Sequence, residues 1–146
     1  VSSSTGVGTN QWSKIFVEQL PIPQLSENEI IPFNIIADYL IYLNNPENKE
    51  LFIRQSNKDI ASLFEKISNM MVFELYFSNE MKEQKVDVLQ IINFKDISSK
   101  NEEDKGSTIL NAYNDLMGEN DEIRNRILVS ESRCEFIKVI NNFSNE

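Results

Sequence analysis

The stretch Asp59–Phe77, DIASLFEKISNMMVFELYF, decides the fold of this chain. Its first half repeats apolar side chains every three or four residues with polar residues between them, so the two sets occupy opposite faces of an α-helix. The apolar face consists of Ile60, Leu63, Phe64, Ile67 and Met71. From Met70 to Phe77 only Glu74 is not apolar, which predicts that this end is covered on nearly all sides. Because apolar stripes are usually core, we expect this helix to form the centre of the fold rather than a cofactor site.

Length and composition indicate a single globular domain. The chain has 146 residues, of which 40% are hydrophobic and 25% charged, so it can bury a core without disulfides or metals. Its one cysteine, Cys134, cannot form an internal disulfide, and no apolar run approaches the roughly 20 residues that cross a bilayer. We therefore expect a cytoplasmic protein with no membrane partner. Because Val1 begins a Ser-, Gly- and Thr-rich run without a signal segment, we expect a piece of a longer protein.

Charge and residue types argue against two classes of function. The net charge of −9 argues against strong DNA binding by the chain alone, because Lys and Arg contacts to phosphate supply most non-specific affinity. The chain has no histidine, which is the commonest general base and metal ligand, and one cysteine cannot build a thiolate zinc site. We therefore expect no catalytic residue, no metal and no cofactor within this chain.

The N-terminal residues 1–25 are expected to form an extended, proline-containing connector. Asn10 can cap a short helix with an apolar face of Trp12, Ile15, Phe16 and Leu20; the alternative is a short strand through Ile15–Val17. The two prolines of Leu20–Pro23 fix their own φ angles and disfavour helix before them, so this stretch must be extended. We divide the chain here, and expect residues 26–146 to form a helical domain.

An antiparallel helical hairpin is expected to open the helical domain. Ser26–Glu29 has the spacing of a capping box and Pro32 suits a first helical turn, so a helix should begin between them. It should end at Asn44–Pro46, and its apolar side carries Phe33, Ile36, Ala37, Leu40 and Leu43. We expect Glu47–Asn57 to form a helical turn or two before the Asp59 helix, which should pack antiparallel to the first.

A third helix and a linker are expected next. Ser78–Glu80 offers a break and a new cap, and the helix after it would carry Met81, Val88, Leu89 and Ile92. Lys95–Gly106 has the composition of a polar linker. Within it, Glu103–Lys105 fits half of a nuclease metal motif, but it lacks the strand that would hold carboxylates around Mg²⁺, so a solvated charge run is favoured.

Two C-terminal segments complete an all-α fold. Ile109–Met117 predicts a fourth helix, which Gly118 should close as a left-handed cap. Ser130 or Ser132 should cap the last helix, whose apolar stripe consists of Phe136, Ile137, Ile140 and Phe143. The expected fold is thus a helical hairpin with additional C-terminal helices.

Three short motifs together resemble the C-terminal end of bacterial type II restriction-modification enzymes. Gln19–Ser26 reads QLPIPQLS, an apolar helix with Pro32–Phe33 follows, and Val72–Tyr76 reads VFELY. The family enzymes combine an adenine-specific DNA methyltransferase, and often a nuclease, with a TaqI-like specificity domain. A similar connector and a V-Y-E-L-Y helix follow their target-recognition region in the same order. Asn120–Leu128 also resembles a segment found after that hairpin in a subgroup of these enzymes.

The resemblance implies a part of such an enzyme that lies outside its active sites. Family methylation uses an Asn-Pro-Pro-Tyr motif to orient the extruded adenine, whereas Asn45–Glu47 lacks the second proline and the aromatic residue. The nuclease motif is missing as well. The implied function is a non-catalytic helical scaffold that supports DNA recognition and packs against the catalytic domain of the same chain. The full-length parent enzyme would bind DNA, S-adenosylmethionine and, if it cleaves DNA, Mg²⁺. The resemblance also leaves room for a homodimer of this chain.

Two small sets of residues are the candidates for DNA contact. The first set lies near the exit of the recognition region: Asn10, Gln11, Trp12 and Lys14. The second set is basic, because arginine can bind phosphate or a guanine edge through two hydrogen bonds, and it consists of Arg124, Arg126 and Arg133. Surface exposure or pairing within the protein is the alternative for these arginines, and the acidic composition favours it.

Two packing hypotheses follow from side chains that need partners. Glu74 stands alone in an apolar helix, and an unpaired buried carboxylate is strongly disfavoured, so we expect it to pair with Arg124 or Arg126. Trp12 is expected to cover the hairpin and to fix the proline connector.

A second class of function stays open beside the restriction-modification scaffold. The chain can instead be a helical protein-protein interaction or dimerisation module unrelated to DNA. An exposed apolar patch on the hairpin would favour this alternative, because such patches mark interfaces. An independent enzyme is the least favoured option.

Overall fold

The computed structural model describes residues 23–144, and this part of the chain is helical without strands. Its helices are α2 Glu27–Asn44, α3 Asn57–Glu83, α4 Glu102–Leu116, α5 Glu122–Arg133 and α6 Glu135–Ser144. The expected all-α fold is therefore confirmed. The predicted helix or strand before Leu20 and the predicted packing of Trp12 lie outside the described residues.

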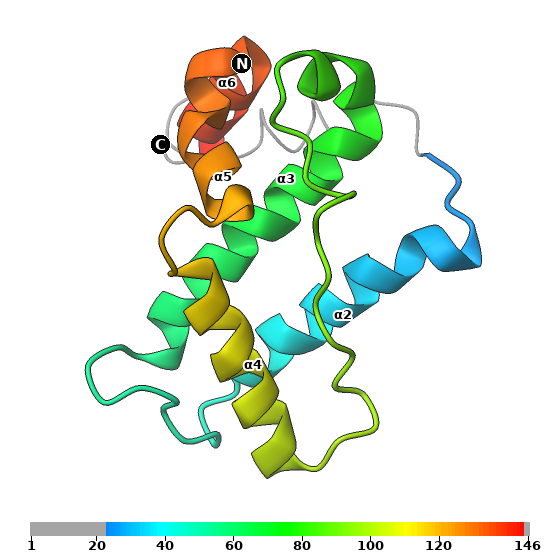
Figure 1. The fold of residues 1–146 in the computed structure, drawn as a ribbon. Coiled ribbons are helices and arrows are strands. Elements are labelled where there is room, and N and C mark those ends of the chain that lie inside the picture. Colours follow the sequence, from blue (N-terminus) through cyan, green and yellow to red (C-terminus); the bar gives the residue numbers. More distant parts are fainter. Residues whose placement is uncertain (1–22, 145–146) are drawn as a thin grey trace, which may run out of the picture.

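Helix α3 is the long central element against which the others are arranged (Figure 1). It begins with a capping box, in which the Ser56 hydroxyl accepts a hydrogen bond from the Asp59 N–H at 3.1 Å. The predicted apolar face is buried except for Leu63, which is half-buried, and residues 70–77 are all buried or half-buried. Phe77 adopts φ −127° and ψ 39°, which kinks the helix where we expected it to end, but the helix continues to Glu83.

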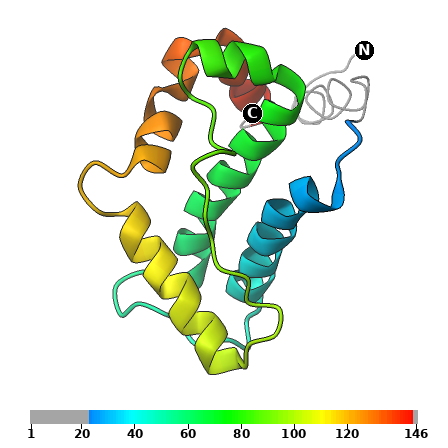
Figure 2. The ribbon, with the colours of Figure 1, turned by 45° about the vertical axis from the view of Figure 1, so that its right-hand side comes forward.

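The predicted hairpin is formed by α2 and α3, which run in opposite directions on either side of the loop that joins them (Figure 2). The Ser26–Glu29 capping box is present, and the helix ends at Asn44 as expected. Tyr39 of α2 meets Phe64 of α3 edge to face, with 5.4 Å between ring centres. Both side chains are fully buried, so this pair lies at the centre of the hairpin core.

The hairpin loop, residues 45–56, is irregular, so the predicted helical turns within Glu47–Asn57 are wrong. The buried Asn57 side chain accepts a hydrogen bond from the Leu51 N–H and donates one to the Lys49 carbonyl, both at 2.9 Å. The Glu50 carboxylate accepts from the Asn57 N–H. These side chains satisfy backbone groups that a helix would otherwise pair, which explains why the loop is ordered without being helical.

The predicted third helix is correct only in its first residues, because helical turns continue to Glu83 after the kink at Phe77. Its later part is wrong, because residues 86–101 are irregular apart from short turns. Lys85 adopts a left-handed conformation with φ 58° and ends α3. The Val86 N–H then donates to the Met81 carbonyl at 2.9 Å, and the Lys85 N–H donates to the Lys82 carbonyl, which is the Schellman pattern. The segment returns along α3 toward α4, and Phe94 packs on Tyr39 on its way.

Helix α4 starts inside the predicted linker, at Glu102, because the Asn101 side chain caps it by accepting from the Asp104 N–H at 2.8 Å. The charge run Glu103–Lys105 therefore lies in the first helical turn, where carboxylates are favoured by the helix dipole. The predicted closing residue is wrong as well. Gly118 does not have a positive φ, and Asn120, with φ 61°, is the left-handed residue after α4.

The last two helices differ from the sequence prediction in their caps. Asp121 caps α5, and the predicted capping residues Ser130 and Ser132 lie inside this helix, where their hydroxyls donate to carbonyls one turn earlier. The expected stripe of α6 covers the kink of α3. The Phe136 ring lies 4.1 Å from the Phe77 ring and 6.2 Å from the Phe73 ring, measured between their centres.

Candidate functional site

Glu74 is only 3% exposed, and the structure corrects its predicted partner. Its carboxylate accepts hydrogen bonds from the backbone N–H groups of Val88, at 2.5 Å, and Leu89, at 3.0 Å. Among the described residues neither Arg124 nor Arg126 forms an ion pair with it. The physical reason is that Val88 and Leu89 follow the end of α3, so their N–H groups have no helical acceptor and supply the donors that a buried carboxylate needs.

Arg126 holds the same segment from the other side. Its guanidinium donates to the carboxylate of Asp87 at 3.0 Å and to the backbone carbonyl of Asp87, and it also pairs with Glu122 at 2.6 Å. Glu74 and Arg126 therefore fix consecutive residues of one loop without touching each other. The sequence indicated that both side chains needed partners, but it could not show that residues 87–89 lie between them.

The other two predicted arginines also bond within the protein. Arg124 donates to the Gly118 carbonyl at 3.2 Å and contacts the Met117 sulfur at 3.7 Å. Arg133 is exposed and donates to the Gln84 carbonyl at 3.3 Å. Of the three, Arg133 is thus the one whose guanidinium is most accessible to an external anion. The other predicted DNA contacts, Asn10, Gln11, Trp12 and Lys14, lie outside the described residues.

Metal-ligand groups and the thiol of Cys134 were the two chemical features to locate among the described residues. No group of three or more Cys, Asp or Glu side chains within residues 23–144 is placed to hold a metal ion. Cys134 is buried, and burial together with the nearby charge of Glu80 raises the pKa of its thiol. A thiol with a raised pKa is protonated at neutral pH and therefore a poor nucleophile.

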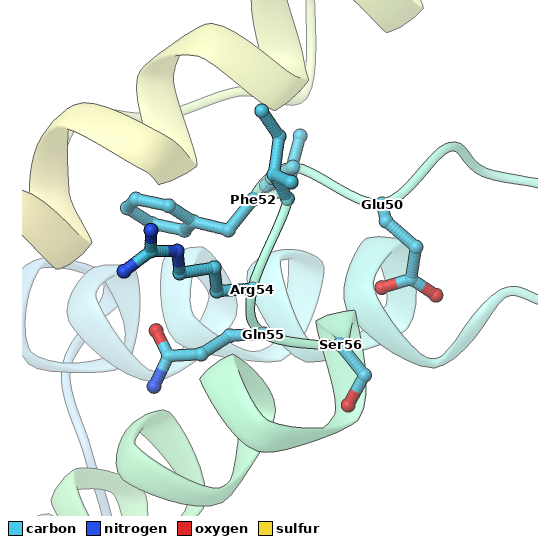
Figure 3. A pocket seen from close by; sticks show the side chains of 7 residues that line it. Glu50, Phe52, Arg54, Gln55 and Ser56 are labelled. Carbon is cyan, nitrogen blue, oxygen red and sulfur yellow. The ribbon is translucent and has the colours of Figure 1, made fainter.

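A hollow of about 500 Å³ lies within the hairpin loop and is lined by residues 50–56 (Figure 3). Phe52, Arg54 and Gln55 point to one side of the loop, while Glu50 and Ser56 point to the other. Phe52 packs edge to face on Tyr113 of α4, whose hydroxyl donates to the Gln55 side chain at 3.1 Å. The hollow is therefore the inner side of a loop that Tyr113 holds in place. Its polar side chains point to two different sides, so they are not arranged to bind one ligand.

The outer side of α2 combines exposed apolar side chains with adjoining hollows. Ile31 is 49% exposed and Ile41 is 69% exposed, although α2 carries only one charged residue after its first turn, Asp38. Two adjoining hollows of about 410 and 260 Å³ follow this side, and they share Asp38 and Ser98. Together they form a furrow between α2 and residues 96–105, which we call the α2 furrow. A helix this apolar is normally covered by another element.

Membrane-spanning capacity and similarity to known proteins complete the description of the site. No helix of the described residues is long and apolar enough to cross a membrane. Comparison of the chain with protein-family models, with curated proteins and with solved structures gave no match.

Proposed function

We propose that this chain is a non-catalytic helical scaffold that attaches to another protein surface through the outer side of α2. The observation that carries the proposal is the pair Ile31 and Ile41, which stay exposed on a helix whose opposite side is fixed in the core. Burying such side chains on binding contributes roughly 25 cal/mol per Å² of apolar surface. The other candidate groups, Glu74 and Arg126, hold the fold together, which suits a scaffold.

Within this proposal, the surface that receives α2 belongs to a restriction-modification enzyme with an adenine-specific DNA methyltransferase. The support is the order of the motifs Gln19–Ser26 and Val72–Tyr76 in the sequence. Within Val72–Tyr76, Phe73 and Glu74 are buried and the other three side chains are half-buried, which suits a structural rather than catalytic use of that motif. The parent enzyme would bind DNA, S-adenosylmethionine and, for cleavage, Mg²⁺, while this domain keeps the specificity region in position.

The alternative is a protein-protein interaction module unrelated to DNA. The same exposed isoleucines favour it, because they are the apolar patch on the hairpin that such a module needs. The net charge of −9 is also compatible with a partner other than nucleic acid.

Two experiments distinguish the restriction-modification scaffold from the DNA-independent module. The first reads the coding sequence on the N-terminal side of Val1, and the second measures co-purification of this chain with the product of that sequence. We expect that sequence to contain a methyltransferase cofactor loop and an Asn-Pro-Pro-Tyr motif. The upstream part, expressed as a separate protein, should retain this chain, and Ile41→Glu should reduce the retained amount at least about tenfold. Leu128→Glu on α5 is the matched control, because Leu128 is 72% exposed and Ile41 is 69% exposed. An upstream sequence without methyltransferase motifs would leave only the DNA-independent module.

Direct DNA contact is tested separately with the 146-residue chain. Because of its acidic charge, we expect weak binding to duplex DNA that is lost between low and physiological salt. Arg133→Ala should remove part of this binding, since Arg133 is the most accessible of the three arginines. Tight binding that resists salt would contradict the scaffold proposal and indicate a direct reader of DNA.

A further inference from the structure

We propose that the α2 furrow binds an amphipathic helix of the partner protein whose apolar stripe is flanked by Lys or Arg. This inference rests on the proposed attachment through α2 and adds the chemical class of the partner. Its basis is the combination of two exposed isoleucines, a continuous furrow and a carboxylate without a partner between them.

The spacing of the furrow residues fits a helix. Ile31, Asn34, Asp38 and Ile41 are three or four residues apart, so they form one row along α2. At a rise of about 1.5 Å per residue, Ile31 and Ile41 stand roughly 15 Å apart along the helix axis. A partner helix of about three turns therefore spans both isoleucines and passes Asp38, which lies closer to Ile41 than to Ile31.

The charges of the furrow favour a basic partner. Asp38 lies in the middle, in the part shared by both hollows, and forms no hydrogen bond or ion pair within residues 23–144. Asp96 and Glu102 also line the furrow, and the only ammonium in its lining, that of Lys105, already pairs with Glu102 at 3.2 Å. Hydrogen bonding from Ser98, whose N–H lies 2.8 Å from the Asp96 carboxylate, and then the charge of Lys100 keep the pKa of this carboxyl below its usual value. Asp38 thus remains available to a Lys or Arg of the partner.

The same charges argue against two other occupants. A second copy of this chain would place one Asp38 row against another and bring two chains of net charge −9 together. Nucleic acid would meet the carboxylates with its phosphates, which is repulsive as well. A helix with basic flanks satisfies both the apolar and the acidic parts of the furrow.

The test uses two labelled peptides of about 18 residues, each with one leucine stripe and either lysine or glutamate on both flanks. Fluorescence anisotropy measures their binding to the 146-residue chain. We expect the lysine peptide to bind at least about tenfold more tightly than the glutamate peptide. Ile41→Glu should weaken binding of the lysine peptide at least about tenfold, and Asp38→Asn should weaken it several-fold at low salt. Leu128→Glu should leave binding of this peptide unchanged.

Three results would overturn the inference. The first is equal binding of both peptides. The second is a loss of lysine-peptide binding in Leu128→Glu that is as large as the loss in Ile41→Glu. The third is a dimer in sedimentation equilibrium that Ile41→Glu dissociates, because the occupant would then be a second copy. If Ile41→Glu still abolishes co-purification with the upstream protein while the peptides do not discriminate, the attachment through α2 stands and only the basic partner is wrong.

Discussion

The carboxylate of Glu74 and the backbone N–H of Val88 are joined by a 2.5 Å hydrogen bond in the interior of the protein. This contact links the apolar end of α3 to the irregular segment that follows the helix. It explains two observations together, because the buried charge needs N–H donors and the segment needs an acceptor in place of helical carbonyls. The one charged residue of the apolar stretch is therefore a clamp that closes the loop after α3.

Substitution of Glu74 should reveal how much this clamp contributes. We expect Glu74→Gln to lower the free energy of unfolding by about 1–2 kcal/mol, because the acceptor stays but loses its charge. Glu74→Ala should cost about 2–4 kcal/mol, since the N–H groups of Val88 and Leu89 lose their acceptor and a cavity remains. Urea denaturation gives both values.

The control for Glu74 is Glu65→Gln on the exposed side of the same helix, which should change the free energy of unfolding by less than about 0.5 kcal/mol. Hydrogen exchange adds a local measurement. In Glu74→Gln, the amides of Val88 and Leu89 should exchange faster than those of the α2–α3 core. Unchanged exchange at these two amides would contradict the clamp.

Lys85 is expected to be a site where glycine stabilises the protein. Its φ of 58° is unfavourable for a residue with a Cβ, and the position ends α3 in the Schellman pattern, where glycine is preferred. Lys85→Gly should therefore raise the free energy of unfolding by about 0.5–1 kcal/mol. Asn120→Gly is the matched comparison, because asparagine tolerates φ 61° and should gain less. A loss of stability in Lys85→Gly would refute the strain argument.

The sequence was sufficient for the parts of the fold that depend on local pattern. The Ser26–Glu29 capping box, the end of α2 at Asn44 and the buried face of α3 each depend on residues within one or two turns of each other. The end of α3 was not predictable in this way. Lys85 terminates it, although lysine rarely adopts the required conformation, and no nearby residue signals the turn.

The candidate site was less predictable, because its contacts join residues far apart in the chain. The hydrogen bond from Arg126 to Asp87 joins residues that are 39 positions apart in the chain. From the sequence alone, Glu74 was an equally suitable partner for Arg126. The α2 furrow was missed for another reason. Isoleucine usually lies in the core, so the sequence does not distinguish Ile31 and Ile41 from Ile36 on the same helix. Only the structure shows that Ile31 and Ile41 are exposed and Ile36 is buried.

Gly106 is expected to resist substitution although it lies inside α4. A Cβ at this position would stand 2.7 Å from the Tyr42 hydroxyl and 3.0 Å from a methyl group of Leu51, both closer than ordinary contacts. Gly106→Ala should therefore lower the free energy of unfolding by about 1–3 kcal/mol, against a gain of about 1 kcal/mol from helix propensity alone.

A double substitution tests the cause of that loss. Tyr42→Phe removes the hydroxyl and leaves the nearest ring carbon 3.5 Å from the new Cβ. Tyr42→Phe should thus recover a large part of the stability lost in Gly106→Ala, measured as a double-mutant cycle by thermal or urea denaturation. Additive effects of the two substitutions would exclude a clash with the hydroxyl.

Tyr39 should make the protein less stable at alkaline pH. Burial in the hairpin core raises the pKa of its phenol to about 12, and its hydroxyl donates to the Lys95 carbonyl at 2.7 Å. The folded state therefore keeps a proton that the unfolded state releases near pH 10, so the contribution is complete below about pH 10 and is lost toward pH 12. Tyr39→Phe should lower the free energy of unfolding by about 1 kcal/mol at pH 7, through the lost hydrogen bond, and should reduce the loss of stability at alkaline pH.

Urea denaturation of both proteins from pH 7 to pH 11 measures this difference. The raised pKa values of Tyr42 and Cys134 affect both proteins equally, so they do not contribute to the difference between the two curves. Parallel pH curves would show that Tyr39 ionises alike in the folded and unfolded states.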